Sequence, residues 1–221
     1  MSKRKDLLRQ VKLAENLHRI TQPAVDPEDE DSGLEALQNR PIPAFPDTSR
    51  LPRLKRFRFQ LLHQWLIQTF PPCRAADIGG GKGLLGYLLQ ESGWQATVVD
   101  PHEQGLPDKY KDILSERRIK VPPQASVPQR VQPFESELGA EFDLLIGLHA
   151  HGCNVKIIDA AARYGCGFVL FPCCVIDEPL TPLPGVHWLE SLAGYAVQQG
   201  LSIQTVRLNF KGQNIGLYTG V

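Results

Sequence analysis

The chain has 221 residues, of which 42% are hydrophobic and 22% charged, and its 24 lysine and arginine residues balance 24 aspartate and glutamate residues. This length allows one domain with a full core plus an appendage, and the zero net charge means that nucleic-acid or membrane binding would depend on a local patch. No apolar run approaches the ~20 residues of a membrane span, and the charged start lacks an apolar signal core, so secretion is not expected.

The first 50 residues are predicted to be separate from the main domain. Residues 4–20 form a helix with an apolar stripe at helical spacing: Leu7, Val11, Ala14 and Leu17. An acidic run at 26–31 and a proline-rich segment at 41–46 follow, and neither continues a helix. We therefore expect a helix and an acidic, proline-rich arm over 1–50, and a single domain over 51–221. If a protein partner binds, this helix and arm are the expected docking element.

A second amphipathic helix is predicted over 54–70. Its apolar face consists of Leu54, Phe57, Leu61, Leu62, Trp65, Leu66 and Phe70. The other side and its approach are basic, with Arg50, Arg53, Lys55, Arg56 and Arg58. Such a charged stretch is usually a solvated helix face. The alternative is a patch that contacts RNA phosphates beside an active site.

Strands alternate with helices in the remaining chain. Strands are predicted at 74–78, 96–99, 142–148 and 167–171, and helices from the glycine turn to about 90, around 107–117, over 154–163 and over 186–199. A further strand lies at either 119–121 or 130–132, and residues 201–218 form a hairpin. This alternation predicts an α/β fold with a Rossmann-like, doubly wound, mostly parallel sheet of seven strands and a C-terminal antiparallel hairpin.

The turn after the first strand is rich in glycine. Glycine reaches positive φ and lets a ligand approach the backbone, and the helix that follows offers unpaired N–H groups. Gly81–Gly86 fits the dinucleotide pattern G-x-G-x-x-G. This pattern is common in strand–helix turns, so a nicotinamide cofactor stays an alternative. Walker A is disfavoured because Gly83, and not Ser or Thr, follows Lys82.

The turn and its flanking acids resemble motif I of the class I S-adenosylmethionine-dependent methyltransferases. The matching residues are Asp77, Gly79, Gly81 and Gly83, with Asp100 closing the next strand. The resemblance implies that the turn holds the methionine part of S-adenosyl-L-methionine and that Asp100 accepts hydrogen bonds from the ribose. Asp143, at the start of a later strand, has the usual position of motif IV. The expected cofactor-binding residues are Asp77, Gly79, Gly81, Gly83, Asp100 and Leu148.

A narrower resemblance covers two later segments. Residues 147–153 are similar to the G-L-H-x-C-G segment of a methyltransferase subgroup that includes tRNA ribose methylases and the methyltransferase domains of poorly characterised proteins, and 171–175 resemble its P-C-C segment. His151 replaces the cysteine of the first segment. The N-terminal zinc-binding segment of the tRNA ribose methylases has no counterpart, since no cysteine precedes Cys73.

His149 and Cys173 are the predicted catalytic residues, because ligands of open α/β sheets bind beyond the carboxyl ends of the strands. His149 would take a proton from the methyl acceptor or would orient the acceptor. The alternative is that His149 only forms a hydrogen bond to a neighbouring loop. Three roles are open for Cys173 and Cys174. The default is apolar packing in the interior, the second is to line the acceptor pocket, and the least favoured is to act as a nucleophile. His149, His151 and Cys153 could bind zinc only together with a cysteine from the next loop. The second group of ligands would then be the adjacent Cys173 and Cys174, whose geometry is unfavourable, so no metal is predicted.

Together these features predict a cytoplasmic S-adenosylmethionine-dependent methyltransferase that acts by in-line methyl transfer. Its five cysteines form no disulfide framework and are read as reduced thiols. The expected acceptor is RNA, either tRNA or rRNA, bound through the basic stretch Arg50 to Arg58. One alternative is a small-molecule or protein acceptor, favoured by the neutral net charge. The other is a cofactor-binding partner subunit without turnover.

Overall fold

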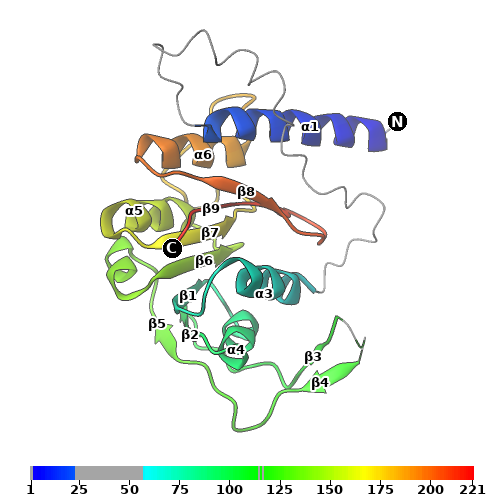
Figure 1. Ribbon diagram of the computed structural model, residues 1–221, viewed down its shortest axis with the longest axis vertical. Helices are drawn as coiled ribbons and strands as arrows, with labels where there is room; N and C mark the ends of the chain where they lie inside the picture. The colour runs from blue at the N-terminus through cyan, green and yellow to red at the C-terminus, as the bar shows by residue number, and fades with distance from the viewer. Residues whose placement is uncertain (1, 23–56, 114, 116) are drawn as a thin grey trace.

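A seven-stranded sheet forms the centre of the protein in the computed structural model, which describes residues 2–22, 57–113, 115 and 117–221 (Figure 1). Its strands are β1 (Arg74–Ile78), β2 (Gln95–Asp100), β5 (Gln129–Val131), β6 (Leu144–Leu148), β7 (Gly167–Phe171), β8 (Gln204–Arg207) and β9 (Ile215–Tyr218). Their spatial order is β5-β2-β1-β6-β7-β9-β8. The first five pair in parallel, and β9 lies antiparallel to both β7 and β8. The predicted Rossmann-like sheet with its terminal hairpin is confirmed.

Helices cover both faces of the sheet (Figure 1). One face carries α3 (Arg58–Thr69) and α4 (Leu84–Glu91), and the other carries α5 (Asn154–Tyr164) and α6 (Trp188–Gln198), with the 3₁₀ helix η3 (Ser136–Glu141) against α5. The residues of strand β6 explain why helices cover both faces of the sheet. Leu144 and Ile146 pack with α3 and α4, whereas Leu145 packs with α5 and α6. Successive strand side chains point to opposite faces, so an unbroken apolar run is buried on both sides.

Helix α1 (Ser2–Thr21) packs across α6 (Figure 1). Leu13 and Leu17 are buried in the core shared with α6. Asn16 Nδ2 donates a hydrogen bond to Glu190 Oε1 at 3.1 Å. Val11 is exposed although the predicted stripe includes it, because the buried positions are set by Leu13 and Leu17, four residues apart.

Helix α3 confirms the second predicted amphipathic helix over the residues that the structure describes. Leu62 and Leu66 are fully buried against the sheet. Leu54, Arg50, Arg53, Lys55 and Arg56 lie outside the described residues, as do the acidic arm and the domain boundary at 50/51. Across the described ranges, no helix combines the length and apolarity needed to cross a bilayer.

The predicted helix around 107–117 is wrong. Strands β3 (Lys109–Lys111) and β4 (Arg118–Lys120) pair antiparallel there as a separate two-stranded sheet. The pairing places Tyr110 opposite Ile119, and Tyr110 packs against the small core beside α4. Residues 119–121 therefore do not supply the outer strand of the main sheet. Strand β5 does, through pairing with β2, as the second alternative expects.

Candidate cofactor and acceptor site

The predicted site residues meet at one edge of the sheet. Strands β1, β2, β6 and β7 are parallel, so their carboxyl ends share an edge. The glycine turn follows β1, Asp100 ends β2, Leu148 ends β6, and Cys173 lies two residues beyond β7. Strand β2 pairs with β1 on one side, and β6, the next strand to pair with β1, lies on its other side. This is the topological switch point where such folds bind ligands.

The glycine turn has a backbone that other residues adopt with strain. Gly79, Gly81 and Gly83 have φ of 64°, 55° and 72°. The Gly79 N–H donates to the Val99 carbonyl at 2.8 Å, which ties the turn to β2. A Cβ on Gly79 would lie 3.4 Å from Ala150, so the turn touches the segment after β6. Gly83 is buried, whereas Gly79 is exposed and Gly81 half-buried, so these two offer backbone to a ligand.

Asp77 lies directly beneath this turn. Its side chain is 2% exposed, and its Oδ2 has no hydrogen-bond partner among the described residues. A Cβ on Gly80 would lie 2.5 Å from that oxygen, so only glycine fits above it. Burial raises the pKa of Asp77 to about 7, with the Gly86 backbone N–H opposing the rise. Asp77 therefore supports the turn from the interior and keeps one acceptor unused.

Asp100 joins the turn to the end of β2. Its Oδ2 accepts a hydrogen bond from the Gly81 N–H at 3.0 Å, and its Oδ1 accepts one from the His102 N–H at 2.9 Å. A carboxylate offers about four acceptor positions. Each oxygen of this half-buried group therefore keeps capacity for a second donor, which suits a pair of ligand hydroxyls.

Leu148, the last residue of β6, and His149, the residue after it, lie in different environments. The Leu148 side chain is buried in the α3–α4 core, so only its backbone is available to a ligand at this edge. His149 has φ of 62°, an uncommon conformation for a residue with a side chain. Its N–H donates to the Phe171 carbonyl at 3.2 Å, and its ring centre lies 6.5 Å from that of Phe210. Strained backbone of this kind concentrates at functional sites.

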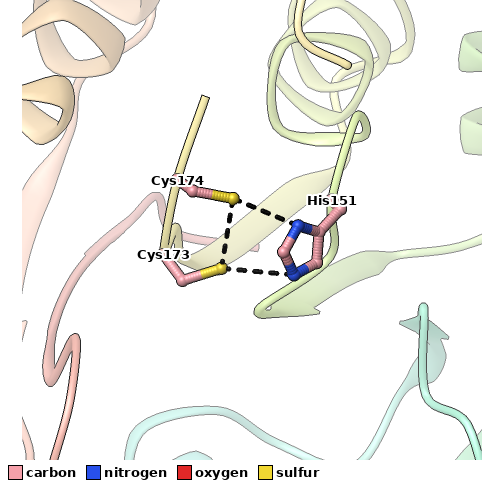
Figure 2. Close-up of side chains that lie close together, drawn as sticks. All are labelled: His151, Cys173 and Cys174. Atoms are coloured by element: carbon pink, nitrogen blue, oxygen red, sulfur yellow. Dashed lines mark hydrogen bonds between the residues drawn. The ribbon is translucent and has the colours of Figure 1, made fainter. Parts of the chain in front are cut away.

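Cys173 contacts His151 and Cys174 (Figure 2). The Cys173 Sγ lies 3.5 Å from His151 Nε2 and 3.7 Å from Cys174 Sγ, and the latter lies 3.1 Å from His151 Nδ1. Partial desolvation and the Cys174 thiol raise the pKa of Cys173 to about 11, with the positive charge of Arg58 opposing the rise. Cys173 is therefore a protonated thiol at neutral pH, which disfavours the nucleophile alternative.

Asp143 lies at the opposite edge of the sheet. Its carboxylate accepts hydrogen bonds from the Arg74 side chain at 2.6 Å and from the Arg74 N–H at 2.9 Å, and this pairing lowers the pKa of Asp143. A surface hollow of about 460 Å³, lined in part by Arg74, Gln95 and Arg130, lies at the same edge. Neither feature adjoins the glycine turn, so the motif IV position contributes nothing to the candidate site.

A basic hairpin, β3–β4, is the feature that sequence reasoning missed. Lys109 pairs opposite Lys120, and Lys111 opposite Arg118, so four cations share one face. Like charges directly opposite each other destabilise a strand pair. The Gln60 side chain donates to the Lys111 carbonyl at 2.7 Å, which anchors the hairpin to α3. The alternation of charge at period two is the signal that could have identified these strands.

Comparisons with known proteins point to methyltransferases over part of the chain. No protein-family model matches. The "Probable tRNA (uracil-O(2)-)-methyltransferase" of Caenorhabditis elegans is 33% identical over 103 residues, which cover 47% of this chain and 17% of the relative. The Homo sapiens protein of the same name is 28% identical over 104 residues, covering 46% and 12%. The matched region is thus a small part of these relatives.

A solved structure, that of monomeric WbdD, has a TM-score of 0.38 and 14% identity over 73% of this chain and 38% of that chain. The sheet order and the strand directions identify the fold of this chain.

Proposed function

We propose that this protein is an S-adenosylmethionine-dependent methyltransferase whose acceptor is RNA, with tRNA as the first candidate. The observation that carries the proposal is the junction of the glycine turn with Asp100 at the switch point of the sheet. An antiparallel β9 beside β7 favours the methyltransferase interpretation over a nicotinamide enzyme. The similarity to proteins named as probable tRNA methyltransferases supports the choice of acceptor.

The residues at the turn fit the cofactor. Gly79 and Gly81 present backbone without a Cβ, and Asp100 has free acceptor positions for two ribose hydroxyls. The carboxylate of Asp100 also suits the positive charge of a sulfonium. When bound, S-adenosylmethionine supplies a methyl carbon activated by its positive sulfur. The role of the protein is to hold the acceptor atom in line with that carbon and to exclude other positions of the acceptor.

His149 is the proposed proton acceptor. A hydroxyl or N–H acceptor loses its proton as its lone pair forms the new bond to carbon, and a neutral imidazole nitrogen can take that proton and pass it to water. The position of His149, one residue beyond β6 and next to the Ala150 that contacts the turn, supports this role. Cys173 is proposed to line the acceptor side of the same edge.

The basic hairpin is the proposed RNA contact. RNA binding to phosphates depends on lysine and arginine side chains that displace counterions. The hairpin holds four such side chains on one face, and Lys111 lies near the start of α3, where its Nζ is 5.9 Å from the Phe57 ring centre. A polyanion would relieve the repulsion within the hairpin. The stretch Arg50 to Arg58 remains a proposed second contact.

The test is methyl transfer from radiolabelled S-adenosylmethionine to cell extract fractionated into RNA, protein and small molecules. We expect label in RNA of tRNA size. Label confined to protein or small molecules would reassign the acceptor. No label in any fraction, together with a stable co-purifying protein, would instead support a partner subunit. Leu13 and Leu17 of helix α1 are already buried in the core shared with α6, which weakens the case for binding a protein partner through the apolar face of α1.

Cofactor binding is tested separately by calorimetry with S-adenosylhomocysteine. Asp100→Ala removes a charged acceptor, so we expect affinity to fall roughly 10- to 100-fold. Asp143→Ala is the matched control, because Asp143 lies at the opposite edge and pairs with Arg74. Equal affinity for wild type and Asp100→Ala would remove Asp100 from the cofactor site.

A further inference from the structure

We propose that His151, Cys173 and Cys174 bind one zinc ion, beside the candidate acceptor site. His151 comes from the segment between β6 and α5, and both cysteines come from the segment after β7 (Figure 2). One potential ligand atom from each residue lies within 4.8 Å of the others. This metal site does not depend on methyl transfer. It departs from the sequence-based expectation of no metal, because His151 and not His149 or Cys153 joins the cysteines.

Two distances between these atoms match the edges of a zinc tetrahedron. Zinc binds sulfur at about 2.3 Å and imidazole nitrogen at about 2.0–2.1 Å, which separates two sulfurs by about 3.8 Å and sulfur from nitrogen by about 3.6 Å. The Cys173 and Cys174 sulfurs are 3.7 Å apart, and Cys173 Sγ lies 3.5 Å from His151 Nε2. Cys174 Sγ lies 3.1 Å from Nδ1 of the same ring, so the exposed imidazole would have to turn for one nitrogen to bind the ion with both sulfurs.

The two segments are held together without the metal. The carboxylate of Glu178 accepts hydrogen bonds from the backbone N–H groups of Asn154 and Val155 at 2.9 and 3.1 Å, at the first turn of α5. A Cβ on Gly152 would lie 3.0 Å from the Asp177 Cβ, so the backbones also meet there. These contacts flank His151 on one segment and the cysteines on the other. The two ligand-bearing segments are therefore close together before the ion arrives, and only the imidazole has to turn.

The ligand types select the ion. Thiolate and imidazole ligands favour zinc over magnesium or calcium, which prefer oxygen. Zinc binding releases the protons of both thiols to solvent and requires no oxidant. Three protein ligands leave the fourth position of the tetrahedron for water. The competing chemistry is a disulfide between Cys173 and Cys174, which needs an oxidant and a sulfur separation near 2.05 Å.

The experiment measures metal on the full chain, purified under reducing conditions without a chelator. We expect one equivalent of zinc by elemental analysis, and thiolate-to-metal charge-transfer absorption when cobalt replaces it. Cys173→Ser and Cys174→Ser should lose the metal, and His151→Gln should bind it at least 10-fold more weakly. Cys73→Ser is the matched control, because Cys73 is a free thiol at the opposite edge of the sheet.

Three results would overturn the proposal. The first is wild-type protein that binds neither zinc nor cobalt after reduction. The second is equal metal loss in Cys73→Ser and Cys173→Ser. The third is a mass lower by two hydrogen atoms with both cysteines protected from alkylation, which would identify the disulfide. Cobalt titration of wild type provides a decisive reading even if a variant fails to fold. None of these readings depends on methyl transfer, so the metal site and the proposed activity fail separately.

Discussion

The carboxyl of Asp77 lies buried beneath the glycine turn with one oxygen lacking a hydrogen-bond partner among the described residues. In the unfolded chain its pKa is near 3.9, whereas burial raises it to about 7 in the folded protein. Both states hold the proton below about pH 4. Between about pH 4 and 7 unfolding releases a proton, so Asp77 lowers the free energy of unfolding as pH rises, and the loss is complete above about pH 7.

Asp77→Asn should abolish this dependence. The free energy of unfolding of the variant minus that of wild type should increase from pH 5 to pH 8, by at most about 3 kcal/mol, because wild type loses stability over this range. Urea unfolding at both pH values measures the difference. Asp143→Asn is the control: pairing with Arg74 lowers the pKa of Asp143, so its protonation does not change in this window. A constant difference between Asp77→Asn and wild type would contradict the raised pKa.

Some site residues could be predicted from sequence and others could not. Gly79, Gly81 and Asp100 could be, because local spacing fixes both the turn and the strand end that follows it. The approach of His151 to Cys173 could not, because it depends on how two loops fold. Glu178 helps to hold those loops together by bonding the first turn of α5 from 24 residues away, and no local pattern encodes that contact.

The same contrast holds for the secondary-structure elements. Strands β6 and β7 are unbroken apolar runs that are buried on both faces, so their sequences suffice to identify them. Strands β3 and β4 have three residues each and are largely polar. Their existence depends on pairing with each other and on the packing of Tyr110. The local sequence favours a polar helix, and the tertiary contacts override that preference.

The basic hairpin allows stability and RNA binding to be separated. Lys109→Glu replaces the like-charged pair with Lys120 by an opposite-charged pair, so stability should stay unchanged or rise by about 0.5 kcal/mol. Affinity for tRNA should fall, and the slope of log K against log salt should shrink by about one. Urea unfolding and filter binding at several salt concentrations measure the two effects.

The control for this variant is Arg163→Glu, which makes the same charge change on α5. Arg163 is exposed and faces Glu137, so its reversal should leave RNA affinity unchanged. If Lys109→Glu and Arg163→Glu weakened tRNA binding equally, the effect would be due to net charge and not to the hairpin.

At the scale of the whole molecule, cofactor binding should appear as stability, because a ligand that binds only the folded state stabilises it by mass action. S-Adenosylhomocysteine at 100 times its Kd should raise the free energy of unfolding by about 2.7 kcal/mol. For a chain of this size Tm should rise by roughly 5 to 10 °C, which a thermal scan with and without ligand measures. NADH should cause no shift, and an equal shift with NADH would favour the nicotinamide alternative.

The packing of α1 on α6 has a consequence for biosynthesis. Asn16 and its partner Glu190 are 174 positions apart, so the N-terminal helix has no docking surface until most of the chain has left the ribosome. At about 5–20 residues per second, that delay lasts roughly ten to thirty seconds. During this time Leu13 and Leu17 lack the α6 surface that buries them in the folded protein. Closure of this long-range contact is therefore a late step in folding.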